Sequence, residues 1–155
     1  MRYVLILLLV ASTARADSLS VNVGVGEFAG LHPLAHGGVY AYAGPGYTHD
    51  LRKGVTWTTA LTLEYAPEFQ HLGLFAWSTI DIPLSETVYL NAGVSLIQDE
   101  YQFVVRGSAF FLGPCIGVTK NLPHDLFLSP SVGVYYGFSD RTPWAYPMLT
   151  FGKTF

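Results

Sequence analysis

Apolar and polar residues alternate along most of this 155-residue chain. In residues 55–65, VTWTTALTLEY, the odd positions are mostly Val, Trp, Leu and Tyr, whereas the even positions are Thr, Ala and Glu. A period of two places successive side chains on opposite faces of a β-strand. The pattern predicts eight strands, over residues 19–28, 38–48, 55–65, 72–82, 87–97, 108–119, 126–138 and 145–155.

The glycine content argues against helices. The chain contains 16 Gly, many within the alternating runs, and each one costs a helix interior about 1 kcal/mol. No segment shows the i, i+3, i+4, i+7 spacing of an amphipathic helix. The connections at 49–54, 83–86 and 121–125 are short and contain turn residues, and the four others are modestly longer. We therefore expect an all-β protein, an eight-stranded antiparallel up-and-down barrel.

Three prolines, Pro45, Pro114 and Pro130, fall inside the predicted strands. Proline cannot donate a hydrogen bond to a strand ladder and is usually found at edges or bulges. We therefore expect β-bulges near the rims of the barrel at these positions.

The first 16 residues have the composition of a secretory signal peptide. Arg2 precedes an apolar run over residues 3–10, and Ala14 and Ala16 form the small-residue site that a signal peptidase cleaves. The run is too short to cross a membrane as a helix, which needs about 20 residues. We expect cleavage before Asp17, which leaves residues 17–155 as one domain.

Charge and cysteine content exclude several classes of protein. Without Arg2 and Arg15, six basic residues face eleven acidic ones, a formal charge of −5. A chain without a basic patch is not expected to bind nucleic acid. The single cysteine, Cys115, excludes a disulfide framework and a multi-cysteine metal site. Charged residues make up only 12% of the chain, against about a quarter in soluble domains, which favours a barrel in a membrane.

Apolar and polar residues alternate along the strands of both soluble and membrane barrels, but the apolar face points inward in a soluble barrel and outward in a membrane barrel. A soluble ligand-binding barrel of the periplasm would turn its apolar face inward. Here the less apolar face consists mainly of Gly, Ser, Thr, Ala and Asn, which carry too little charge to keep a barrel in solution. We expect these small residues to fill a narrow lumen without a wide pore, and the branched and aromatic residues to face lipid.

Trp57 and Tyr65 have the spacing of two aromatic girdles. They lie on one face, eight residues apart, which is ~26 Å along a strand at ~3.3 Å per residue. A tilt of about 40° reduces this to a height of ~20 Å, close to the ~25 Å apolar band of membrane barrels. We predict that these two residues mark the two membrane interfaces.

The signal peptide, the eight alternating strands and the final Phe resemble the small eight-stranded outer-membrane β-barrel proteins of Gram-negative bacteria. The likeness covers the whole mature chain and rests on architecture. In that class the terminal aromatic strand is read by the barrel-assembly machinery, and Leu149, Phe151 and Phe155 resemble this signal; Lys153 departs from it. The resemblance implies a monomer in the cell outer membrane, in contact with lipopolysaccharide and, during biogenesis, with periplasmic chaperones.

Few residues are candidates for chemistry. Glu64 lies on the predicted lumen face, and a buried carboxylate needs a partner. Arg106 and Arg141 can reach the same end of the barrel, so the three are predicted to form an interior polar cluster. A second candidate group, at the outer rim, comprises His32, His36, His71 and Glu68. Its spacing is not diagnostic of zinc, so we assign no metal, cofactor or catalytic residue.

The sequence favours a structural or surface-interaction protein over an enzyme. Some small barrels of the resembling class modify lipid A, so a deacylase or acyltransferase is the alternative. Such an enzyme needs a Ser–His pair oriented by an acid, and the His-x-Ser motif of the deacylase type is absent from the sequence. An unchanged lipid A profile in expressing cells would argue against the enzyme.

Overall fold

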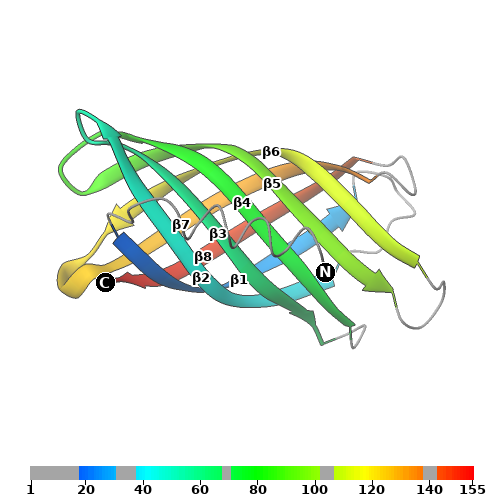
Figure 1. Ribbon diagram of the computed structural model, residues 1–155. Helices are drawn as coiled ribbons and strands as arrows, with labels where there is room; N and C mark the ends of the chain where they lie inside the picture. The colour runs from blue at the N-terminus through cyan, green and yellow to red at the C-terminus, as the bar shows by residue number, and fades with distance from the viewer. Residues whose placement is uncertain (1–17, 31–37, 68–70, 102–106, 138–142) are drawn as a thin grey trace.

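The computed structural model is a closed antiparallel β-barrel of eight strands, and it describes residues 18–30, 38–67, 71–101, 107–137 and 143–155. Each strand pairs with its neighbours in the sequence, and the last pairs with the first (Figure 1). The strands are β1 (Ser18–Gly30), β2 (Gly38–Arg52), β3 (Val55–Ala66), β4 (His71–Pro83), β5 (Val88–Tyr101), β6 (Gly107–Asn121), β7 (Leu126–Gly137) and β8 (Pro143–Thr154). The predicted fold class is confirmed.

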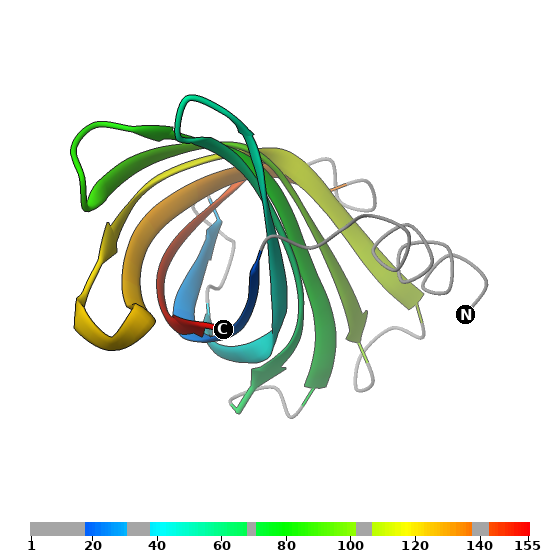
Figure 2. The same ribbon diagram turned by 60° about the vertical axis from the view of Figure 1, so that its left-hand side comes forward.

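Three short hairpins and the C-terminus lie at one end of the barrel, here called the turn end; the opposite end is the loop end (Figure 1, Figure 2). At the turn end, Lys53 and Gly54 join β2 to β3 with φ of 55° and 77°, and glycine adopts such a conformation without strain. A 3-10 turn, η1 (Pro123–Asp125), joins β6 to β7. Among the residues that the structure describes, no helix is long and apolar enough to cross a membrane.

The last strand closes the barrel against the first. The ladder between them runs from the Ser20–Thr154 pair to the Gly30–Trp144 pair. Beyond it, the backbone N–H of Phe155 donates to the carbonyl of Leu19 at 2.7 Å. Closure removes the exposed strand edge that could not be tolerated in lipid.

The expectation of bulges at the three prolines is wrong. The β2–β3 ladder keeps one register on both sides of Pro45, and the β6–β7 ladder does so on both sides of Pro114. Pro130 pairs directly with Leu149 in an unshifted β7–β8 ladder. A strand residue donates its N–H to only one neighbouring strand, so each proline removes a single hydrogen bond and leaves the register intact. Among the ladder pairs that the structure describes, a register shift occurs between Asp50 and Arg52, beside the hairpin.

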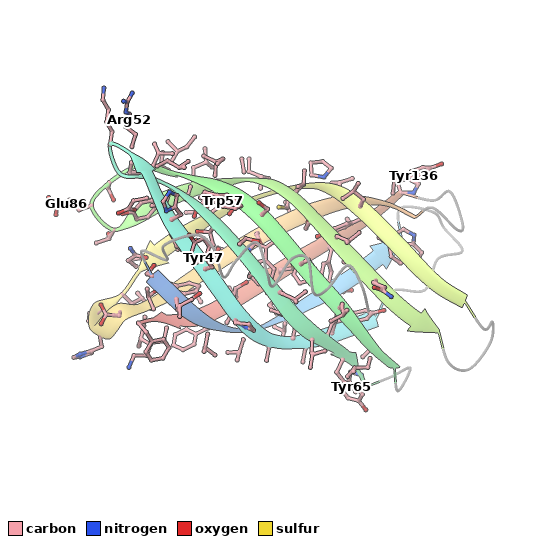
Figure 3. All side chains as sticks on the ribbon, viewed as in Figure 1. Tyr47, Arg52, Trp57, Tyr65, Glu86 and Tyr136 are labelled. Carbon is pink, nitrogen blue, oxygen red and sulfur yellow. The ribbon has the colours of Figure 1, made fainter. Side chains whose placement is uncertain are left out.

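Large apolar side chains cover the outside of the barrel, as the alternation predicts. We call this surface the apolar belt (Figure 3). Of the charged side chains that the structure describes, none lies on the outward face between the strand ends; Glu27, Lys120 and Lys153 lie near those ends. The belt includes Leu19, Val21, Val23, Val25, Leu63, Leu72, Ile80, Val94, Leu96, Leu112, Ile116, Val132, Val134, Leu149 and Phe151.

The lumen holds large aromatic side chains as well as the small residues that were predicted to fill it. Tyr, Phe and Trp rings occupy much of it, and the inward glycines make room for them. A Cβ atom on Gly26 would lie 2.6 Å from Cε2 of Tyr146, and one on Gly133 would lie 2.4 Å from Cε2 of Tyr135. Inward glycines are therefore needed where large rings occupy the space above them. Such an alternation of small and large inward side chains fills a narrow barrel.

Candidate functional site

Aromatic rings from several strands fill the lumen toward the loop end of the barrel. This aromatic plug consists of Tyr40 and Tyr42 on β2, Phe75 on β4, Tyr135 on β7 and Tyr146 on β8, each 4% exposed or less. The ring of Tyr146 meets those of Tyr40, Phe75 and Tyr135 edge to face, with centroids 6.1, 5.7 and 6.0 Å apart. Edge-to-face contacts of this kind are favourable beyond the area they bury. The plug therefore holds opposite walls of the barrel together.

Glu64 on β3 lies within the aromatic plug and is 1% exposed. The hydroxyl group of Tyr146 donates a hydrogen bond to Oε1 of Glu64. A buried carboxylate is costly unless donors surround it, and a hydrogen bond to a charged acceptor is stronger than a neutral one. This contact therefore ties β3 to β8 across the lumen.

Most other residues of the predicted interior cluster and of the predicted outer-rim group lie outside the residues that the structure describes. Arg106 and Arg141, predicted to join Glu64, lie outside the described residues, as do His32, His36 and Glu68. Of His71, only the backbone is described; it begins β4 and pairs with Ala66. The predicted clusters therefore stay predictions, and the polar contact that the structure shows for Glu64 comes from a tyrosine.

Between the aromatic plug and the turn end, the lumen contains a cavity of about 280 Å³, here called the vestibule. All eight strands contribute to its wall, mostly with Ser, Thr and Asn side chains. Phe75, Trp77 and Met148 border it on the side of the plug, whereas the exposed residues Asp50 and Asn121 lie at the turn end. The vestibule is therefore a cavity with a largely polar wall and an apolar boundary on the side of the aromatic plug.

Asp81 on β4 is the centre of the polar network in the vestibule. Its Oδ2 accepts hydrogen bonds from the hydroxyl groups of Thr58 and Thr56, the latter at 3.3 Å. Its Oδ1 accepts from the hydroxyl of Thr79 at 2.8 Å and from Nδ2 of Asn91 at 2.7 Å. Strand register produces this arrangement, because Thr56 and Asn91 are the partners of Asp81 on the two neighbouring strands.

The network continues around the wall away from Asp81. Oδ1 of Asn91 accepts from the hydroxyl of Thr119 at 2.9 Å, and that hydroxyl lies 2.9 Å from the Ser129 hydroxyl. Hydrogen bonds thus link β3, β4, β5, β6 and β7 at one level of the lumen. Sequence reasoning missed this site, although Asp81 is a lone carboxylate on one face of the predicted strand 72–82.

Trp57 and Tyr65 lie toward opposite ends of β3 (Figure 3). Near the turn end, Nε1 of Trp57 donates to Oγ of Ser78 at 2.8 Å, and its ring meets that of Tyr47 edge to face at 6.2 Å. Tyr65 is 46% exposed on the outward face near the loop end. An indole that is half buried and hydrogen-bonded suits a membrane interface, where one side is apolar and the other wet. Their role as girdle residues stays a prediction.

The described part of the chain offers little for metal or nucleophilic chemistry. Within it, no group of three or more His, Cys, Asp or Glu side chains is placed to hold a metal ion. Cys115 has a free thiol and is buried in the wall of the vestibule. The polar wall of the vestibule can bind polar groups, and the rings of the aromatic plug border it toward the loop end.

Searches by sequence and by structure give different results. No protein-family model and no curated protein matches the sequence. The fold is similar to that of a structure described as de novo design of transmembrane beta-barrels, with a TM-score of 0.57, 12% identity, and coverage of 92% of this chain and 98% of the other.

Natural barrels show the same similarity. Neisserial surface protein A (NspA) has a TM-score of 0.56 at 14% identity, with 89% of this chain and 96% of the other covered. Ail, the attachment invasion locus protein of Yersinia pestis, has a TM-score of 0.52 at 16% identity, with 91% and 100% covered. At such identities the likeness shows the fold, which is that of eight-stranded transmembrane β-barrels.

Proposed function

We propose that this chain is a small integral protein of a bacterial outer membrane, with a structural or surface-interaction role and no open pore. Residues 1–16 serve as its cleaved signal peptide, and the turn end faces the periplasm. In bacterial outer-membrane barrels the short turns are periplasmic and the longer loops extracellular. In this proposal, Leu149 and Phe151 on the outward face of β8 and Phe155 just after it form the assembly signal.

One observation carries the membrane location. The apolar belt encircles the barrel and, within the described residues, is free of charge between the strand ends. Exposed contiguous apolar surface of this extent is not stable in water. The same side chains in a bilayer would contact lipid, and the closed ladder would leave no strand edge unpaired there.

The aromatic plug supports a barrel without a through-pore. Its rings occupy the lumen from β2, β4, β7 and β8, so the vestibule ends on them. The fold itself does not define a role. With the lumen closed, the loops remain the part through which such a barrel could act. The names of two similar barrels, Neisserial surface protein A and the attachment invasion locus protein of Yersinia pestis, are consistent with this role.

Planar-bilayer recording tests the closed lumen. We expect the refolded full-length protein to give no steady single-channel current, because the aromatic plug blocks the path of hydrated ions. A combined Tyr42→Ala and Tyr146→Ala variant should be leakier than the wild-type protein, since it removes two rings of the plug. Large, steady currents from the wild-type protein would contradict the proposal.

A further inference from the structure

We propose that the vestibule is a binding site for a small organic cation that carries hydrogen-bonding groups, such as an aliphatic amine. The inference goes beyond the structural role proposed above. It rests on three features of the described residues: the charge at the wall of the cavity, the aromatic surfaces beside that charge, and the exposed lining residues Asp50 and Asn121 at the turn end.

The charge of the vestibule has one sign. Asp81 is 7% exposed, and its described contacts are four neutral donors, from Thr56, Thr58, Thr79 and Asn91. Neutral donors stabilise a carboxylate without cancelling its charge. Asp50 adds a second carboxylate at the turn end, and none of the described residues lining the cavity is Lys, Arg or His. A cleft lined by one sign of charge with low-dielectric walls concentrates ions of the opposite sign.

The shape and chemistry of the wall favour an organic cation over a metal ion. In the described chain, no three carboxylate, thiol or imidazole side chains converge on one point. Instead, the rings of Phe75, Trp77, Tyr89 and Phe127 line the cavity, and aromatic faces attract ammonium groups. The hydroxyl and amide groups of the wall can accept the N–H bonds of such a ligand. A volume of about 280 Å³ has room for a small molecule in place of several waters.

Cys115 provides a natural probe of access. Its thiol lies in the vestibule wall at mid-barrel, where the residue pairs with Gly93 and Gly133. No other cysteine occurs in the chain. A reagent that modifies this thiol must first enter the vestibule, so the rate of modification reports which molecules the chamber admits.

The test compares methanethiosulfonate reagents on the full-length protein refolded in lipid vesicles. The Cys115 thiolate attacks the reagent to form a mixed disulfide and releases methanesulfinate. After normalisation to their rates with a free thiol, we expect the cationic aminoethyl reagent to react about tenfold or more faster than the anionic sulfonatoethyl reagent. Putrescine should slow modification by the neutral methyl reagent, whereas butanediol, a neutral diol of the same chain length, should not.

Two charge substitutions distinguish an effect of the carboxylate in the vestibule from an effect of the overall charge of the protein. Asp81→Asn keeps the shape and should bring the two charged reagents to nearly equal rates and abolish protection by putrescine. Glu86→Gln removes a charge from an exposed turn at the same end, outside the vestibule (Figure 3), and should change neither result. If Asp81→Asn does not fold, salt provides the second test, since at 1 M the screening length is about 3 Å and the preference should collapse.

Three results would overturn the proposal: equal normalised rates in the wild-type protein, equal protection by putrescine and butanediol, or no modification of Cys115 by any reagent. The proposed membrane role would survive each of them, because it depends on the outer surface. Heat-modifiable migration of each sample in gels shows that the barrel under test is folded.

Discussion

Replacing Val23 by Arg should destabilise the folded barrel by about 2–4 kcal/mol, the cost of a cationic side chain on the lipid face at the middle of a bilayer. Val23 lies midway along β1, opposite Ala43 and Phe151, and is 45% exposed on the outward face. An arginine there would place its guanidinium in hydrocarbon, far from either interface. Urea unfolding of the barrel in phospholipid vesicles measures the change.

Leu51→Arg is the matched control for depth. Leu51 is similarly exposed, at 48%, but it lies beside the β2–β3 hairpin at the turn end. Near an interface the same charge costs about 0–1 kcal/mol. Equal effects of the two substitutions, or no effect of Val23→Arg, would contradict a belt in contact with lipid.

Gly26→Leu should destabilise the barrel by about 3 kcal/mol or more, at the upper end of the cost of overpacking. The three atoms nearest to an added Cβ at Gly26 all belong to the ring of Tyr146, at 2.6, 2.7 and 2.9 Å. That ring cannot retreat, because Tyr40, Phe75 and Tyr135 surround it. We expect the folded, heat-modifiable form to be lost or strongly reduced in gels.

Two variants show whether the clash has the expected origin. Val25→Leu, on the lipid-facing side of the same strand, should change stability by no more than about 0.5 kcal/mol. Adding Tyr146→Ala to Gly26→Leu should restore part of the stability, because it removes the obstructing ring. The restoration is partial, since Glu64 loses the hydroxyl group that donates to it. Strictly additive effects would contradict direct contact between residues 26 and 146.

The sequence was sufficient to predict the number of strands and to identify which face of each strand points outward. Alternation identifies two faces, and the scarcity of charge shows that neither face suits water, so the bulky aliphatic one must face lipid. The strand 72–82 shows where this reasoning fails. Phe75 and Trp77 lie in the lumen, on the same face as Asp81, so apolar residues occur on both faces and the alternation is weak.

Predicting which side chains meet in the lumen requires the pairing register of neighbouring strands, and the sequence does not reveal that register. Tyr40 and Tyr42 occupy the face opposite Val39 in the predicted strand 38–48, and this was a signal for inward rings. Which rings share a level depends on how each strand is offset from its neighbours. The same holds for the vestibule, because Asp81 meets Thr56 and Asn91 only through its place in two ladders. A shift of one residue would turn these side chains outward.

Site-directed spin labelling in a bilayer tests most directly which face of the barrel meets lipid. In a Cys115→Ser background, single nitroxide labels are placed at Ser20, Val21, Asn22, Val23 and Val25 on β1; Gly24 is left unlabelled, because a Cβ atom there would lie 2.3 Å from Cζ of Tyr42. We expect collisions with dissolved oxygen, which concentrates in hydrocarbon, to be frequent at Val21, Val23 and Val25 and rare at Ser20 and Asn22, with a water-soluble nickel complex excluded from the odd positions. Oxygen collisions that peak at the even positions, or access of the nickel complex to Val23, would contradict the claim that the apolar outer face of the barrel meets lipid.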